Sequence, residues 1–297
     1  MSTLSMAADH RADVRPPGTE FVLTSTDFQA IAAMLRHDAG IALPEFKTAL
    51  VYARLAKRLR ALGLGSFADY CVLVAGPSGT DERRHMMTAL TTNLTSFFRE
   101  AHHFEHLKTQ VLPSLLDNAR RGGRVRLWSA ACSTGQEAYS LALTILSLAP
   151  DAARLDIRVL GTDIDTAVLA EAQAGVYADA EFGTVPPDLR ARWFQRVRDA
   201  SGGWRVTDDL RRLVSFRQLN LAGGGWPMKG RFHAILCRNV VIYFDDTIQA
   251  AVWGRLTPLV EPGGHLYIGH SERLIGPAAR AFENVGITTY CLLGGEA

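Results

Sequence analysis

The segment VRLWSAACSTGQEAYSLAL, residues 125–143, decides the fold class of this chain. It opens with an apolar run, passes through the small residues Ala131 to Gly135, and continues with a helical pattern from Gln136. This order predicts a buried strand, a tight loop and a helix, which form the repeating unit of a parallel α/β sheet. A second apolar run ends at Asp163, 28 residues after Gly135.

These two strand ends predict a nucleoside-binding site. In parallel sheets, ligands bind beside the carboxyl ends of the strands, where the helix start offers N–H donors. Asp163 can accept hydrogen bonds from ribose hydroxyls there. The loop lacks the G-x-G-x-x-G glycines that a pyrophosphate requires, which disfavours a nicotinamide dinucleotide. An adenosyl group without phosphates, as in S-adenosylmethionine (SAM), fits better. The alternative is an ordinary strand–loop–helix unit that binds nothing.

Composition excludes several classes of protein. The net charge of +2 is too small to indicate nucleic-acid binding. No apolar run approaches the roughly 20 residues of a membrane span, so no membrane insertion is expected. The cysteines form no C-x-x-C pair, and a cytoplasmic location is expected. His102 and His106 have i, i+4 spacing but lack a third ligand, so we predict no metal site.

The hydrophobic pattern changes along the chain and predicts separate domains. From residue 124, apolar runs alternate with helical stretches, which is typical of a doubly wound α/β sheet. The stretch from about 176 to 212 fits this alternation poorly, and we interpret it as a small antiparallel β-subdomain. The expected divisions are a disordered tail over 1–23, an N-terminal helical domain over 24–88, a linker with its helix over 89–123, and the α/β domain over 124–297.

Six motifs, in this order, resemble one known family. They are TTNLTSFFRE at 91–100, AACSTGQEAYS at 130–140, GTDID at 161–165, LNL at 219–221, CRNVVIYF at 237–244 and GGHLYIGHSE at 263–272. Together with the helical segment at 47–70, they resemble the bacterial chemotaxis protein methyltransferase family, CheR, over roughly residues 24–293. The resemblance implies a SAM-dependent methyltransferase (Rossmann-like) doubly wound sheet with a small antiparallel β-subdomain, preceded by an all-α N-terminal domain.

The resemblance also implies an activity in the adaptation of bacterial chemotaxis. The methyl group of SAM would pass to glutamate side chains of methyl-accepting chemotaxis receptors, giving glutamate methyl esters and S-adenosylhomocysteine (SAH). The chain departs from the family pattern at Gln136, where Glu is frequent, at Ala138, where Pro is frequent, and at His233, where Asp is common. None of these positions is assigned to chemistry.

The resemblance assigns site residues position by position. A glutamate carboxylate is already ionised at pH 7, so the reaction needs no general base. Arg99 and Tyr243 are the expected catalytic residues. Arg99 would oppose the rise in pKa that burial imposes on the acceptor carboxylate, bind the cofactor's own carboxylate, or do both. The Tyr243 hydroxyl would orient the acceptor. The expected cofactor contacts are Asn93, Thr95, Arg99, Glu137, Asp163, Asn220, Leu221, Arg238 and Asn239.

Basic residues without acidic neighbours occupy the stretch 46–68. On a helix, Lys47, Arg54 and Arg58 share one stripe. Two interpretations stay open: a solvated face, or a substrate-docking face for an acidic, glutamate-bearing receptor helix. Some members of the family bind a receptor's C-terminal tether through the β-subdomain, which offers a second docking site. A monomer is expected.

Two alternative functions remain. A non-catalytic sensor of SAM or SAH would keep Asp163 but lose Arg99 or Tyr243, and all three residues are present. A SAM-dependent methyltransferase acting on a different carboxylate, such as a small acid, would need no docking surface.

Overall fold

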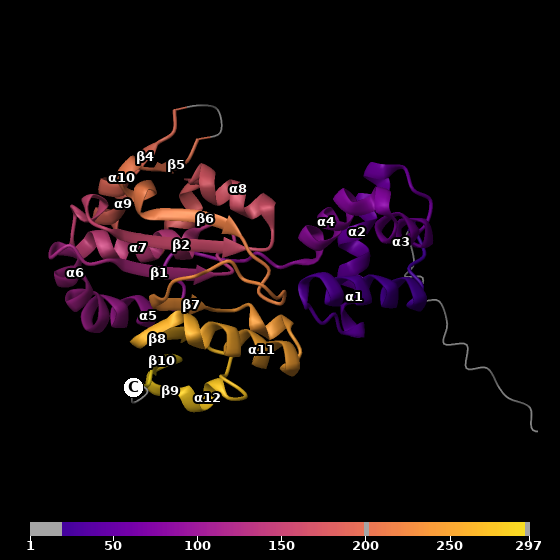
Figure 1. The fold of residues 1–297 in the computed structure, drawn as a ribbon. Helices are drawn as coiled ribbons and strands as arrows, with labels where there is room; N and C mark the ends of the chain where they lie inside the picture. Colours follow the sequence, from indigo (N-terminus) through magenta and orange to yellow (C-terminus); the bar gives the residue numbers. More distant parts are fainter. Residues whose placement is uncertain (1–19, 199–201, 295–297) are drawn as a thin grey trace, which may run out of the picture. The chain divides into compact units, whose positions relative to one another are not determined.

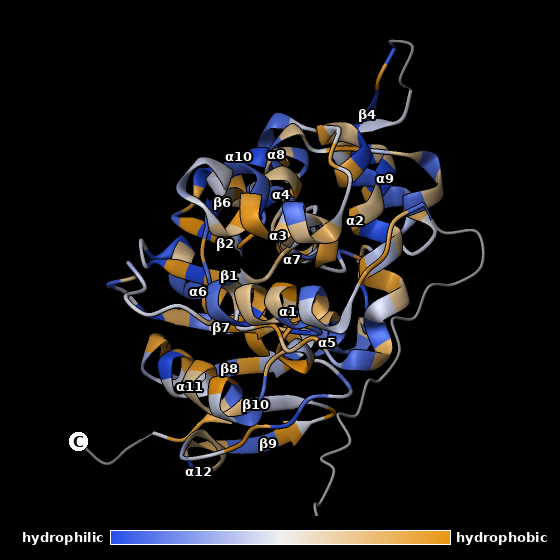
Figure 2. Ribbon diagram, turned by 90° about the vertical axis from the view of Figure 1, so that its right-hand side faces the viewer, coloured by the Kyte–Doolittle hydropathy of each residue, from blue (hydrophilic) through white to orange (hydrophobic). Residues whose placement is uncertain are grey.

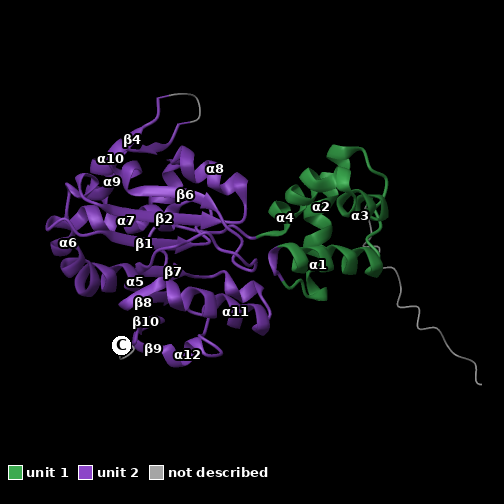
Figure 3. Ribbon diagram, viewed as in Figure 1, with its two compact units in different colours: residues 1–38, 42–91 green, residues 39–41, 92–297 purple. Residues whose placement is uncertain are grey.

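The computed structural model describes residues 20–198 and 202–294. The first 19 residues of the predicted tail, and Ser201 of the β-subdomain, lie outside the described residues. The described chain forms two compact units, which Figure 3 distinguishes by colour. The first contains residues up to 38 and residues 42–91; the second contains residues 39–41 and everything from Thr92 onward. The expected linker over 89–123 is therefore divided between the units.

The first unit is helical, and local signals set its helix ends. Thr24 and Asp27 cap the first helix reciprocally: each backbone N–H donates to the other's side chain over 3.1 Å. The Ser66 hydroxyl accepts from the Asp69 N–H over 3.1 Å and caps the third helix. Gly63 ends the second helix in the left-handed conformation. The helices are α1 (Ser25–Ala39), α2 (Thr48–Leu62), α3 (Phe67–Ala75) and α4 (Thr80–Leu90).

The second unit is built on a seven-stranded sheet of order β6-β2-β1-β7-β8-β10-β9. The first five strands in this order are parallel, and β10 runs antiparallel to both neighbours. The chain winds outward from β1 through β2 to β6, then returns to place β7 on the other side of β1. This confirms the doubly wound sheet and puts its switch point between β1 and β7. The strands are β1 (Val125–Ala130), β2 (Ile157–Asp163), β6 (Val214–Gln218), β7 (Phe232–Cys237), β8 (Val260–Ile268), β9 (Phe282–Gly286) and β10 (Thr289–Leu292).

Both faces of the sheet are buried, because side chains alternate between two hydrophobic clusters. Leu127 packs into one cluster and the next residue, Trp128, into the other. Helices α7, α8 and α10 cover the first face together with α5 and α6, and α11 with α12 covers the second. Figure 2 shows hydrophobic and hydrophilic colours mixed along both the strands and the helices. The helices are α5 (Ala101–His106), α6 (Leu112–Arg120), α7 (Gln136–Leu148), α8 (Thr166–Ala174), α9 (Pro187–Trp193), α10 (Asp208–Leu213), α11 (Asp246–Leu256) and α12 (Ala278–Ala281).

A second, smaller sheet confirms the predicted β-subdomain. Its order is β3 (Val176–Tyr177), β5 (Trp204–Val206), β4 (Phe194–Arg196), and all pairs are antiparallel. Phe97 of the linker motif packs against this sheet: its ring centroid lies 5.0 Å from that of Tyr177 in β3 and 5.8 Å from that of Phe194 in β4. Among the described residues, no helix is both long and apolar enough to span a bilayer.

Candidate functional site

The loop after β1 is forced into a tight path. Ala131, Ser133 and Gly135 all have positive φ, of 65°, 50° and 95°. A Cβ atom on Gly135 would lie only 2.8 Å from the Cβ of Ala172 in α8 and 3.0 Å from the Tyr177 hydroxyl. Only glycine fits this close approach. It allows the chain to turn sharply at Gly135, so that α7 begins at the next residue.

Asp163, at the end of β2, lies beside this loop. Its carboxylate accepts hydrogen bonds from the backbone N–H of Ser133 over 2.8 Å and of Asp165 over 3.0 Å. Only 8% of the residue is exposed, and burial raises its pKa although the two N–H groups oppose the rise. Asn93 joins the same cluster: its amide donates to Asp165 over 3.2 Å, and its carbonyl accepts from the Ser133 hydroxyl over 2.9 Å. The linker motif is thereby tied to the strand ends.

Glu137, in the first turn of α7, is the second acid of the site, and most of its side chain is buried. The Ser129 hydroxyl donates to it over 2.7 Å, and Arg238 lies 3.5 Å from its other oxygen. Burial raises the pKa of the Glu137 carboxyl, while the positive charge of Arg238 opposes this effect. A buried acid with a raised pKa is stabilised by any further cation that binds beside it.

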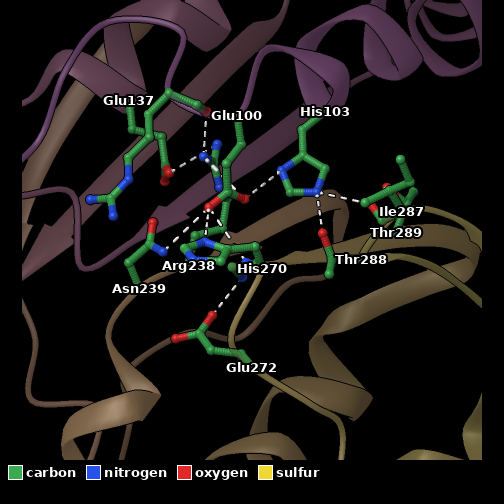
Figure 4. A network of polar contacts seen from close by, with 12 residues as sticks. Glu100, His103, Glu137, Arg238, Asn239, His270, Glu272, Ile287, Thr288 and Thr289 are labelled. Atoms are coloured by element: carbon green, nitrogen blue, oxygen red, sulfur yellow. Dashed lines mark hydrogen bonds and ion pairs between the residues drawn. The ribbon is translucent and has the colours of Figure 1, made fainter.

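Arg238, directly after β7, is the cation at the centre of the network in Figure 4. Its side chain is 1% exposed and lies between Glu137 and Glu100, 3.6 Å from the latter. It donates one hydrogen bond to the carbonyl of Arg99. Its Nε and one terminal nitrogen have no hydrogen-bond partner within the described chain. Buried donors without acceptors are costly, so the site is suited to a ligand that brings a carboxylate or another acceptor.

Two further acids, Glu100 and Glu272, organise the site, and no role was predicted for either of them. Glu100 accepts from the Asn239 amide over 3.3 Å and lies 3.2 Å from a ring nitrogen of His270. Glu272 accepts three backbone hydrogen bonds, from Val240 over 2.9 Å, Val241 over 3.1 Å and Gly269 over 2.5 Å. The only sequence signal was their place at the ends of the motifs TTNLTSFFRE and GGHLYIGHSE.

Hydrogen bonds and close charges thus join the predicted site residues into two groups. Asn93 and Asp163 meet through Ser133 and Asp165. Glu137, Arg238 and Asn239 form the other group, together with Glu100. Arg99 contributes its carbonyl to Arg238, while its own guanidinium donates to the Leu94 carbonyl over 3.0 Å. Thr95 is half-buried, and the described chain shows no hydrogen bond from it to either group.

The remaining predicted site residues lie on the loops after β6 and β7. After β6, Asn220 accepts from the Ala222 N–H over 2.9 Å, and Leu221 is buried in the second hydrophobic cluster. Tyr243 is half-buried at the end of a 3-10 turn over Val241–Tyr243. Their roles stay predictions.

Two of the predicted docking residues hold the first unit together. Arg58 binds Glu82 with two hydrogen bonds of 2.9 and 2.5 Å, and the Tyr70 hydroxyl donates to the same carboxylate. Arg54 donates to the carbonyls of Ala89 and Thr91 at the end of α4. Both guanidinium groups therefore bind other parts of the first unit, which differs from the interpretation of this stripe as a solvated face. Lys47 is half-buried at the start of α2. A docking role for these residues stays a prediction.

Two of the three histidines of α5 contact hydroxyl groups, whereas His102, the partner of His106 in the i, i+4 pair, is exposed. His106 lies 3.0 Å from the Tyr267 hydroxyl, and buried His103 lies 2.9 Å from the Thr288 hydroxyl. Glu100, His102 and His103 bring potential ligand atoms within 4.8 Å of one another. However, the Arg238 guanidinium is 3.6 Å from the same carboxylate and opposes a metal cation there.

Comparisons with known proteins match most of the chain to one family. The profile of the family "CheR methyltransferase, SAM binding domain" matches residues 93–291, and that of "CheR methyltransferase, all-alpha domain" matches residues 26–91. A probable chemotaxis protein methyltransferase of Rhizobium etli is 54% identical over 86% of this chain and 96% of its own. Chemotaxis protein methyltransferase 2 of Pseudomonas aeruginosa is 42% identical over 91% of this chain and 94% of its own. The chemotaxis protein methyltransferase of Escherichia coli is 41% identical over 91% and 92%.

Proposed function

Because the chain belongs to the CheR methyltransferase family, whose members are SAM-dependent methyltransferases of chemotaxis, we propose that it methylates glutamate side chains of methyl-accepting chemoreceptors. The products are glutamate methyl esters and SAH. The observation that carries this proposal is the buried site around Arg238. Two acids lie beside its guanidinium, of which Nε and one terminal nitrogen have no hydrogen-bond acceptor in the described chain.

The residues of this site fit SAM. Its sulfonium supplies an electrophilic methyl group. Asp163 would accept hydrogen bonds from the ribose hydroxyls, and Glu137 would bind the methionyl ammonium. The two nitrogens of Arg238 that make no hydrogen bond within the described chain need an acceptor, which the methionyl carboxylate would provide. The buried network therefore has a complementary charge for each charged group of the amino-acid part of SAM.

The chain's own contribution to the reaction is mainly positioning. A glutamate acceptor is ionised at pH 7 and attacks without a base. Correct alignment of two reactants lowers the barrier by up to about 7–11 kcal/mol. We assign Arg99 to keeping the acceptor ionised as it enters the site and Tyr243 to orienting it.

Recognition of the receptor is assigned to surfaces outside the site. Lys47, Arg54 and Arg58 offer positive charge to an acidic receptor helix. Gln195 and Arg196 of β4 are exposed at an edge of the small sheet, and an edge strand can pair with an extended tether. We also propose that the protein acts as a monomer and in the cytoplasm. No observation favours the alternatives of a non-catalytic sensor or of another carboxylate substrate.

The test is methyl transfer from methyl-labelled SAM to receptor-rich membranes, followed by mild base. Methyl esters hydrolyse and release volatile labelled methanol, whereas methylated nitrogen keeps its label. Base-labile label on a receptor-sized band is the expected result. Base-stable label, or tight SAM binding with no label on any receptor, would contradict the proposal.

A further inference from the structure

Glu100 connects three loops that meet at the site, as Figure 4 shows. It precedes α5, and one of its oxygens accepts from the amide of Asn239, after β7. The same oxygen lies 3.4 Å from the backbone nitrogen and 3.2 Å from the ring nitrogen of His270, after β8. The other oxygen faces Arg238 at 3.6 Å and His103 at 3.5 Å.

The backbone at this point is strained, and the side-chain contacts stabilise it. Glu100 has φ 56° and Asn239 has φ 59°, both in the left-handed region that residues with a Cβ disfavour. The hydrogen bond between them joins two strained positions. Strained conformations persist where the surroundings fix them, and they concentrate at functional sites.

The charges around Arg238 explain why a second acid is needed. Glu137 and Glu100 lie on two sides of this single guanidinium, 3.5 and 3.6 Å away. Burial lowers the pKa of His103 to about 3, with the Arg238 charge acting in the same direction, so His103 adds no positive charge. If Glu100 were neutral, Arg238 would be balanced by Glu137 alone. The charges of Glu137 and Arg238 would then neutralise each other, and Glu137 would lose its capacity to bind another cation.

We propose that Glu100 is a positioning residue that shares the charge of Arg238, fixes the Arg238–Asn239 loop, and thereby leaves Glu137 available to the ammonium of SAM or SAH. The inference rests on the proposed function only through this ligand site. It requires no particular methyl acceptor.

The first measurement is SAH binding by calorimetry for the wild type and for Glu100→Gln. The amide keeps an oxygen for Asn239 and His270 but removes the charge facing Arg238. We expect SAH to bind at least about tenfold more weakly. Glu105→Gln, on the exposed side of α5, is the matched control and should bind within twofold of wild type.

The pH profile separates positioning from a general loss of structure. Glu137 is surrounded by Arg238, Ser129, Glu100 and Glu272, and the negative charge of Glu100 contributes to raising the pKa of Glu137. Glu100→Gln should therefore move the midpoint of the pH dependence of SAH binding to lower pH. Glu100→Asp, which keeps the charge, should keep the wild-type midpoint.

The inference is overturned if Glu100→Gln binds SAH within twofold of wild type with an unchanged midpoint. It is also overturned if Glu100→Asp shifts the midpoint as far as Glu100→Gln does. If Glu100→Gln does not fold, the test rests on Glu100→Asp, and a shifted midpoint in the pH dependence of its SAH binding overturns the inference. Because these titrations contain no acceptor, failure of receptor methylation would leave their outcome unaffected.

Discussion

Gln136, in the first turn of α7, donates a hydrogen bond from its side-chain amide to Glu181 of the β-subdomain over 2.8 Å. The Thr134 hydroxyl donates to the amide oxygen of Gln136 over 2.8 Å. The loop between β1 and α7 is thus joined to the β-subdomain by the buried side-chain amide of Gln136, whose nitrogen donates and whose oxygen accepts. This explains why Gln is accommodated at a position where the family often has Glu.

Gln136→Glu should weaken this connection, because it sets two carboxylates against each other. We expect a loss of about 1–3 kcal/mol in the free energy of unfolding, together with weaker SAH binding. Adding Glu181→Gln to this variant restores a donor opposite a carboxylate and should recover most of the loss. Urea unfolding of both single variants and the double variant tests this. Losses that simply add in the double variant would show that the pair is not coupled.

Glu272 should be required for the shape of the loop that carries Arg238 and Tyr243. Its carboxylate accepts three backbone N–H bonds, so Glu272→Gln would turn an amide N–H₂ toward at least one of these donors. We expect a stability loss of about 1–3 kcal/mol and a raised KM for SAM. Exposed Glu283→Gln is the control. Unchanged stability in Glu272→Gln would refute this role.

The pH dependence of binding and stability follows from the raised pKa values of Glu137 and Asp163. Without ligand, these groups hold protons that the unfolded chain has released. The free energy of unfolding therefore falls as pH rises from the ordinary carboxyl pKa toward the folded one. A cationic ligand favours ionised Glu137, so binding of SAH should strengthen with pH in this window and release protons. Calorimetry in buffers of different ionisation enthalpy measures this release; a binding enthalpy independent of the buffer throughout the window would contradict it.

Replacing Arg58 should lower the stability of the first unit, whether or not Arg58 also contributes to docking. Arg58→Ala leaves the Glu82 carboxylate, with 8% of its side chain exposed, without its cation. We expect a loss of about 1–3 kcal/mol, measured by urea unfolding. Arg60→Ala, which removes an exposed pair with Glu20, should have no measurable effect. A test of docking by charge reversal is therefore cleaner at Lys57, which is exposed on the same helix.

Local patterns predicted the parts of the fold that depend on neighbouring residues. The apolar run of β1, the small residues before Gln136 and the carboxylate at the end of β2 lie close together in sequence, and their geometry follows from strand and helix periods. Glu100 and Glu272 could not be assigned in this way, because their partners lie on loops 139 and 31 residues away. Arg58 was placed on the correct helix, but its partner Glu82 lies on another helix. The hairpin of β9 and β10 was not predicted, because only Phe282 and Val285 of β9 are apolar and β10 is only four residues long.

Arg99→Ala should lose far more activity than stability. Its guanidinium is half-buried and donates to the Leu94 carbonyl, a contact whose loss has a small energetic effect. We expect kcat for receptor methylation to fall at least about tenfold while the unfolding midpoint stays near that of wild type. Equal losses in activity and stability would indicate a structural role instead.

Mapping the transferred methyl group shows whether this chain esterifies receptor glutamates. Purified protein would be incubated with SAM and the cytoplasmic helical fragment of a chemoreceptor, and the fragment's peptides would be sequenced by mass spectrometry. We predict methyl groups on glutamate side chains, absent when Asp163→Ala replaces the wild type. Methyl groups on lysine, arginine or another side chain, with glutamates unmodified, would contradict the proposed esterification.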